Sequence, residues 1–332
     1  MNIALNFPAL LQAFFTDRLI AQRNASAHTV AAYRDTFRLL FDYAREQLGK
    51  APSALALEDL NCAFVGAFLD HLQRDRGNRE RSRNARLAAI HSFFQYVAYQ
   101  MPEHSSLVQR VLAIPGKKYE RALVEYLNKE ETRALLDAPD RSTFTGRRDH
   151  ALVLVGIQTG LRVSELTSLA CGDVTFGTGA HVRCVGKGRK ARCTPLTQSV
   201  ATVVKAWIKE RHPQPDDPLF PNRQGGHLST DGVQFILTKH VTVAQEHCPS
   251  LKEKTVSPHV LRHTAAMNLL HAGADPAAIA LWLGHERLDT VNIYVKADLA
   301  AKERILAKTA TPKGKTRRFR PDDALLAFLK SL

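Results

Sequence analysis

The sequence has few cysteines and no long apolar run. Its five cysteines, Cys62, Cys171, Cys184, Cys193 and Cys248, are widely separated and form no C-x-x-C pair. Neither a disulfide framework nor a cysteine-ligated zinc site is therefore expected. No apolar stretch approaches the roughly 20 residues needed to span a bilayer, and the opening MNIALNFPALLQAFF has neither a basic leader nor a small-residue cleavage site. We expect a cytoplasmic protein with no membrane partner.

Acidic residues are also scarce relative to basic ones. The 332-residue chain has 46 Lys and Arg against 32 Asp and Glu, which gives a formal net charge of +14. Its composition, 45% hydrophobic and 23% charged, is that of a globular protein long enough for two domains. The cationic excess favours a polyanionic partner, most simply nucleic acid.

The first hundred residues are typical of a helical bundle. Apolar residues recur at spacings of three and four in residues 7–22, 26–49, 60–77 and 81–100. Periodicity then lapses around AIPGKKYERAL, which indicates a linker. We predict a helical DNA-binding domain at 1–108, a linker at 109–121, a second domain at 122–310, and a basic tail with a terminal helix at 311–332.

One connection in this bundle is rich in arginine. The segment RDRGNRERSRNAR between the third and fourth helices contains only two acids. It is either a solvated turn or a surface that binds phosphates without regard to base sequence. We favour phosphate contacts from Arg74, Arg76, Arg79, Arg81, Arg83 and Arg86.

The second domain starts with helical patterns and then changes character. AHVRCVGKGRKARCTPL alternates on both sides of a Gly-Lys-Gly centre, which predicts a β-hairpin in helical surroundings. Its tip carries Lys187, with Arg189 and Lys190 as further candidates for DNA contact. The fold class is therefore mainly α with a small β-hairpin or sheet.

The segment SPHVLRHTAAMNLLHAG predicts a helix with cations on one face. Ser257 and Pro258 suit its start and Gly273 its end. His259, Arg262 and His263 fall at i, i+3 and i+4. These residues could form an ordinary solvated face, ligate zinc, or bind an anion; the missing Glu after His259 weakens the zinc interpretation.

Other segments carry comparable chemistry. TGLRVSEL places Arg162 three residues before Glu165, and LGHERLDTVNIYV delivers His285 after a helix-ending glycine, with Tyr294 nine residues later. Taken singly, each has an ordinary structural explanation, such as a local ion pair or a core tyrosine.

Together, two arginines, a lysine, two histidines and a tyrosine suit attack on a phosphodiester. Guanidiniums can stabilise the growing negative charge of the pentavalent transition state as a divalent metal would. Neighbouring cations favour the tyrosine phenolate, and histidine can accept its proton. No metal or other cofactor is then expected.

The quoted motifs TGLRVSEL, GKGRKAR, HVLRHT and LGHERLDTVNIYV resemble those of the tyrosine recombinases, the phage integrase family, in order and approximate spacing. The resemblance covers nearly all of residues 122–300. ARLAAIHSFFQYV in the first domain is similar to the family's helical core-binding domain. The resemblance implies a two-domain clamp around DNA.

It also implies roles for individual residues. Arg162 and Arg262 would hold the scissile phosphate, with Glu165 supporting them, and His285 would add a phosphate hydrogen bond. His259 would manage the proton of the nucleophile and Lys187 would be the general acid. Tyr294 would form a 3′-phosphotyrosyl link, which a 5′ hydroxyl can reverse without ATP. His263 fits the pattern, but we assign it no chemistry.

The family works as a homotetramer on two paired duplexes and exchanges a C-terminal helix. Here ADLAAKERILAKT or DDALLAFLKSL could be that helix. The basic tail favours a mobile-element role, in integration or transposition. Two alternatives remain: a catalytically silent DNA-binding accessory factor of the same fold, and a relaxing topoisomerase of type IB.

Overall fold

The computed structural model describes residues 6–119, 124–186 and 190–284, together with Val291 and Tyr294. The chain divides into two compact units, Met1–Arg121 and Ala122–Leu332, each with its own hydrophobic core. No helix within these described ranges combines the length and the apolar character needed to cross a bilayer.

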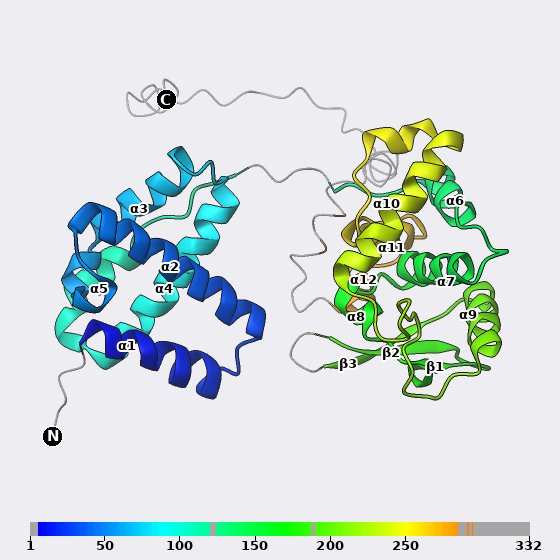
Figure 1. Cartoon of the computed structure of the whole chain (residues 1–332), viewed down its shortest axis with the longest axis horizontal. Coiled ribbons are helices and arrows are strands. Elements are labelled where there is room, and N and C mark those ends of the chain that lie inside the picture. Colours follow the sequence, from blue (N-terminus) through cyan, green and yellow to red (C-terminus); the bar gives the residue numbers. More distant parts are fainter. Residues whose placement is uncertain (1–5, 120–123, 187–189, 285–290, 292–293, 295–332) are drawn as a thin grey trace, which may run out of the picture. The chain divides into compact units, whose positions relative to one another are not determined.

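Unit 1 is helical, and its four main helices lie where the periodicity predicts them (Figure 1). The first helix comprises α1 (Phe7–Ala13) and its π-helical continuation η1 (Phe14–Gln22), and the others are α2 (Ala27–Leu48), α3 (Cys62–Arg74) and α4 (Glu80–Gln100). Short 3₁₀ turns at Pro52–Ala54, Leu57–Leu60 and Pro102–His104 connect them.

Aromatic side chains fill the core of this unit. Phe14 packs edge-on against Phe37 and Phe93 and stacks on Tyr33.

The start of α2 has a local cap. The Ser26 hydroxyl accepts a hydrogen bond from the Thr29 backbone N–H, as expected of an N-cap residue.

One predicted boundary was wrong. Helix α5 (Ser105–Leu112) extends four residues into the range 109–121 predicted as linker. The reason is packing: Val108 and Val111 on α5 are buried in the core of unit 1.

Unit 2 is also mainly helical, with one small sheet. Its helices are α6 (Lys129–Asp137), α7 (Phe144–Thr159), α8 (Val163–Thr167), α9 (Gln198–Arg211), α10 (Thr230–His247), α11 (Pro258–His271) and α12 (Pro276–Leu283), with 3₁₀ turns at Cys171–Asp173 and Pro249–Glu253. The predicted hairpin is confirmed as β2 (His181–Val185) and β3 (Ala191–Pro195), in the register Arg183 to Cys193. A short strand, β1 (Val174–Thr175), adds to the antiparallel order β1-β2-β3.

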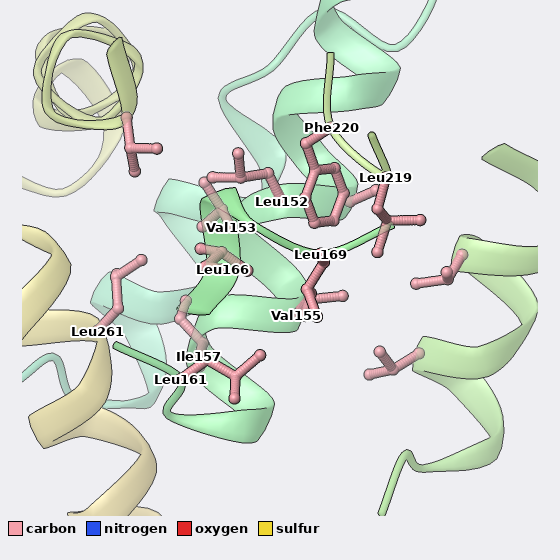
Figure 2. Packing of buried hydrophobic residues seen from close by; sticks show 14 of the residues in the cluster. Leu152, Val153, Val155, Ile157, Leu161, Leu166, Leu169, Leu219, Phe220 and Leu261 are labelled. Carbon is pink, nitrogen blue, oxygen red and sulfur yellow. The ribbon is translucent and has the colours of Figure 1, made fainter. Parts of the chain in front are cut away.

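The core of unit 2 surrounds α7. Figure 2 shows Leu152, Val153 and Val155 packed with residues from distant segments, including Phe220 and Leu261. Because α7 is buried over most of its length, it forms a fixed base for α8 and α11, which carry the candidate site residues.

A second, smaller cluster lies beside α11 and α12. We call it the tyrosine cluster; it consists of Ala266, Met267, Ile279, Ala280, Leu283, Val291 and Tyr294. Local caps explain its two helices. Ser257 and Asp275 accept hydrogen bonds from the first turns of α11 and α12, and Gly284 ends α12 in a left-handed conformation.

Candidate active site

Two arginines from different elements converge on the end of α12. Arg262, on α11, donates from Nη1 to the Gly160 carbonyl at 2.6 Å and from Nη2 to the Leu283 carbonyl at 2.8 Å. Arg162, at the start of α8, donates from Nη2 to the next carbonyl, that of Gly284, at 3.1 Å. The last carbonyls of a helix lack partners within the helix and lie at its negative end. The two guanidiniums therefore fix α12 and are held close together by it.

Gly160 permits this close approach. It ends α7 with φ +64, and a Cβ at this position would lie 2.6 Å from the Leu283 side chain and 3.0 Å from that of Ala265. Only glycine therefore lets α7, α11 and α12 meet here. The Gly160 carbonyl is then within reach of Arg262.

Burial tunes Arg262. Its side chain is buried, and burial, reinforced by the positive charge of Arg162, lowers the pKa of Arg262 to about 10. Arg262 therefore remains charged at neutral pH. The predicted cationic face of α11 is thus not simply solvated, because Arg262 on this face is buried in the protein interior.

Glu165 binds Arg162 and also Arg192, a residue that the sequence motifs did not single out. Its carboxylate accepts hydrogen bonds from Arg162 Nη1 at 2.9 Å and from Arg192 Nη1 and Nη2 at 2.8 and 2.7 Å. Burial alone would raise the pKa of Glu165, but the hydrogen bonds from Arg192 and Arg162 outweigh it and hold the pKa below its usual value. The buried carboxylate is therefore ionised.

Arg192 joins three parts of the site. It lies on β3, its guanidinium pairs with Glu165 near α8, and a Cβ on Gly284 would lie only 2.9 Å from its Nη1 atom. The hairpin, α8 and the end of α12 therefore meet at this side chain. The segment GKGRKAR, from Gly186 to Arg192, includes the predicted Lys187, but nothing local in it distinguishes Arg192 from its basic neighbours.

Tyr294 is deeply buried in the tyrosine cluster, with 1% of its surface exposed. Its hydroxyl lies 3.1 Å from Nδ1 of His263. Burial raises the pKa of Tyr294, and the charges of Arg262 and Arg162 oppose that rise. The hydroxyl is thus electrostatically coupled to both arginines.

The histidine in contact with Tyr294 is His263, to which the sequence motifs assigned no catalytic role. His259 is exposed, and its ring stacks near that of His263, with centroids 6.5 Å apart. The signal for His263 was its position four residues after His259 on one helical face. That spacing did not show which histidine faces the tyrosine.

In sequence, the remaining predicted residues of unit 2 lie mostly on the hairpin tip and after α12. Lys187, Arg189 and His285 lie outside the described residues. Lys190 is exposed on the hairpin. Within the described ranges no group of three His, Cys, Asp or Glu side chains gathers as metal ligands would, so His259 and His263 have no third ligand there.

The arginines between α3 and α4 do not behave alike. Arg74, Arg76, Arg79 and Arg81 are exposed. Arg83 is instead buried and donates to the Pro115 carbonyl, while Arg86 donates to Ala32 and Thr36 on α2. These last two guanidiniums hold α4 against its own unit, so we remove them from the predicted DNA-contacting set.

Comparison with known proteins gives matches over both units. The profile described as "Phage integrase family" matches residues 125–300, and that of "Phage integrase, N-terminal SAM-like domain" matches residues 13–100. A Sinorhizobium fredii (strain NBRC 101917 / NGR234) protein, y4rC, named as an integrase/recombinase, is 55% identical over 97% of this chain and 97% of its own. Tyrosine recombinase XerC of Pelotomaculum thermopropionicum is 32% identical over 83% of this chain and 90% of its own.

Solved structures share the fold. XerH site-specific recombinase, bound to its palindromic difH substrate, superimposes with a TM-score of 0.70 at 24% identity, covering 86% of this chain and 81% of that one. The Tn1549 transposon integrase, in complex with transposon right end DNA, gives a TM-score of 0.66 at 16% identity, covering 90% and 99%. With a family profile over more than half of the chain, the protein belongs to the phage integrase family and is a tyrosine site-specific recombinase.

Proposed function

We propose that this recombinase cleaves DNA with Tyr294 while Arg162 and Arg262 hold the scissile phosphate. The observation that carries the proposal is the convergence of the two guanidiniums on the consecutive carbonyls of Leu283 and Gly284, with both charges acting on the Tyr294 hydroxyl. Each guanidinium has five N–H groups, and the bonds named above use two on each. The planar donors suit phosphate oxygens, whose charge grows in the transition state.

The remaining roles follow the family motifs. Tyr294 oxygen forms a bond to phosphorus as the bond from phosphorus to the 5′ oxygen breaks, and a 3′-phosphotyrosyl link results. Lys187 gives the leaving 5′ oxygen its proton, and His285 hydrogen-bonds the phosphate. The family motifs also include His259 among the residues that manage the proton of the nucleophile. Glu165 holds Arg162 in position, a role supported by their 2.9 Å ion pair.

Strand joining is the reverse of cleavage. Because the covalent link keeps the energy of the phosphodiester, a 5′ hydroxyl of a second strand can attack it and release Tyr294. The enzyme therefore needs no ATP. The proposed catalytic residues also require no metal, because the arginines supply the positive charge.

We further propose that the two units clamp double-stranded DNA at specific recombination sites in the cytoplasm. Support comes from the net charge of +14, from the exposed Arg74, Arg76, Arg79 and Arg81, and from the DNA in the XerH and Tn1549 integrase structures. Lys190 would add a contact from the hairpin. Integration or transposition of a mobile element is the role we favour.

We also propose a homotetramer on two synapsed duplexes, with the segment Asp322–Leu332 packing on a neighbouring subunit. This segment lies outside the described residues. Its apolar residues, which include Leu325, Leu326 and Phe328, suit a helix that docks on another chain. Truncation after Thr309 should abolish synapsis; recombination that survives this truncation would exclude the proposed contact.

The test of catalysis uses a nicked suicide duplex made from the DNA that flanks the gene, incubated in EDTA. We expect wild type to form a denaturant-stable adduct at the 3′ end and Tyr294→Phe to form none while binding the same DNA. Tyr126→Phe is the matched control, because Tyr126 is a partly buried tyrosine packed on the same cluster; it should form the adduct as wild type does.

Other results favour the alternative functions. If wild type binds this DNA but forms no adduct, the DNA-binding accessory factor becomes the better interpretation. If wild type relaxes supercoiled plasmid but never joins two marked duplexes, the activity is that of a topoisomerase. Cleavage that stops in EDTA would restore a role for a metal.

A further inference from the structure

His263 contacts the atom that the proposed reaction uses. Its Nδ1 lies 3.1 Å from the Tyr294 hydroxyl oxygen, and the two rings meet edge to face with centroids 5.5 Å apart. A distance of this size is a hydrogen bond between a ring nitrogen and a hydroxyl. Tyr294 is 1% exposed and His263 is half-buried, so little water competes for this contact.

The fold makes this contact specific to His263. Residues i and i+4 share a helical face, but His259 lies in the first turn of α11 and is exposed, whereas His263 lies one turn deeper, beside the buried Arg262. The ring of His259 stacks on that of His263, with 6.5 Å between centroids. Of the two histidines, His263 is the one with a hydrogen bond and a ring contact to Tyr294 among the described contacts.

We propose that His263, and not His259, accepts the proton of the Tyr294 hydroxyl during DNA cleavage. His259, whose ring stacks on that of His263, then influences this proton only through His263. This inference rests on the proposed function, since it requires Tyr294 to be the nucleophile.

The protonation state of His263 suits an acceptor. Burial, followed by the charges of His259 and Arg262, lowers the pKa of His263 to about 4. The imidazole is therefore neutral at neutral pH and keeps one nitrogen lone pair. In the tautomer with the proton on Nε2, the Tyr294 hydroxyl donates to Nδ1.

The ionisable groups around His263 and Tyr294 explain why proton transfer between them requires bound DNA. Among the described residues they are His259 and Arg262 on α11 and Arg162 on α8. All are cationic or can become so, and they disfavour an imidazolium, while burial disfavours a phenolate. A phosphate held by the arginines adds negative charge, which favours protonation of His263.

The step balances. The Tyr294 oxygen–phosphorus bond forms while the bond from phosphorus to the 5′ oxygen breaks. The phenol proton moves to Nδ1 of His263, and the 5′ oxygen takes a proton from Lys187. In strand joining, His263 returns its proton to the departing Tyr294 oxygen and Lys187 regains the proton of the attacking 5′ hydroxyl.

The experiment measures single-turnover cleavage of a suicide duplex whose scissile 5′ bridging oxygen is replaced by sulfur. The thiolate leaves without a proton, so the assay is insensitive to Lys187 and reports on the nucleophile alone. Rates are compared from pH 6 to pH 9 for wild type, His263→Ala, His263→Asn and, as the matched control one turn away, His259→Ala. DNA affinity is measured for each by fluorescence anisotropy.

We expect His263→Ala and His263→Asn to cleave about 100-fold or more slowly at pH 7, because general base catalysis contributes about that much. Their rates should then rise about tenfold per pH unit, because the tyrosine must ionise first, whereas the wild-type rate should change little over this range, because His263 is already neutral. DNA affinity should stay within about twofold. His259→Ala should keep the wild-type pH profile with a smaller loss.

Three results would overturn the inference. In the first, His263→Asn, which retains a hydrogen-bonding group near Nδ1, restores the wild-type rate and profile, and the role is then only to hold the tyrosine. In the second, His259→Ala shows the larger loss and the steeper profile. In the third, His263→Ala cleaves as wild type does. His263→Asn serves as the test if the alanine variant does not fold.

Failure of the proposed function looks different. In that case wild type forms no adduct on DNA that it binds, or Tyr294→Phe forms one, and both proposals fall. A Tyr294-dependent adduct that does not depend on His263 leaves the proposed function intact and removes only this inference.

Discussion

Single residues set the geometry of the site through close backbone contacts. Gly160 is the clearest case, because its carbonyl receives Arg262 and its missing side chain leaves room for Leu283. Its left-handed φ of +64 would itself strain any other residue. Conformational strain and steric overlap therefore act together at this position.

Gly160→Ala should destabilise unit 2 by about 2–5 kcal/mol, the sum of left-handed strain and overpacking. Gly179→Ala is the matched control, because Gly179 has φ +75 and a Cβ there would have no neighbour within 4 Å; it should cost about 1 kcal/mol. Urea unfolding followed by tryptophan fluorescence measures both, since the two tryptophans, Trp207 and Trp282, both lie in unit 2. Equal losses for the two variants would show that the close approach is relieved elsewhere.

Several elements are joined at the candidate active site by one buried carboxylate. Glu165 on α8 pairs with Arg192 on β3, whose side chain is 14% exposed. On the same hairpin Arg183 pairs with Asp173, but its side chain is 64% exposed. The two ion pairs differ in burial and also in geometry, because Arg192 makes two hydrogen bonds of 2.8 and 2.7 Å whereas Arg183 makes one of 3.3 Å.

Arg192→Ala should cost about 3–5 kcal/mol, because it leaves a buried carboxylate short of a partner. Arg183→Ala should cost only about 0–1 kcal/mol, as exposed pairs do. The pKa of Glu165 is depressed in the folded state, so the stability it contributes is present above its unfolded pKa and is lost as pH falls through its folded pKa. The gap between wild type and Arg192→Ala should therefore close on acidification; a pH-independent gap in urea unfolding would contradict this.

The whole molecule is predicted to bind DNA with both units. In unit 1 the structure separates exposed arginines from two that bind their own chain, Arg83 and Arg86. Only the exposed ones can release counterions on binding, and this release sets the salt dependence of affinity. The charge of unit 1 is thus not uniformly available to DNA.

Replacing Arg76, Arg79 and Arg81 together with alanine should weaken DNA binding and reduce the slope of log affinity against log salt by about 0.9 for each phosphate that is no longer neutralised. The control replaces Arg23, Arg45 and Arg110, which are also exposed in the same unit. Fluorescence anisotropy titrations at several salt concentrations measure both slopes. If the control lowers the slope as much, net charge rather than this connection accounts for binding.

Local features were accessible from the sequence alone. The four helices of unit 1, the hairpin, the Ser257 cap and the Gly284 stop all lie where the sequence predicts them. Each depends on periodicity or on hydrogen bonds within a few residues, so the sequence order already contains the geometry. The order of four motifs was sufficient to indicate the family.

Packing decided the contacts between residues that are far apart in the chain. Glu165 and Arg192 are 27 residues apart, and His263 and Tyr294 are 31 apart. Arg83 reaches Pro115 across 32 residues and becomes buried, although its neighbour Arg81 is exposed. The sequence by itself determined the family and most of the helices and strands. Only the tertiary structure decided which arginine supports Glu165 and which histidine contacts the tyrosine, because those partners meet when α7, α11, α12 and β3 bury their apolar faces together.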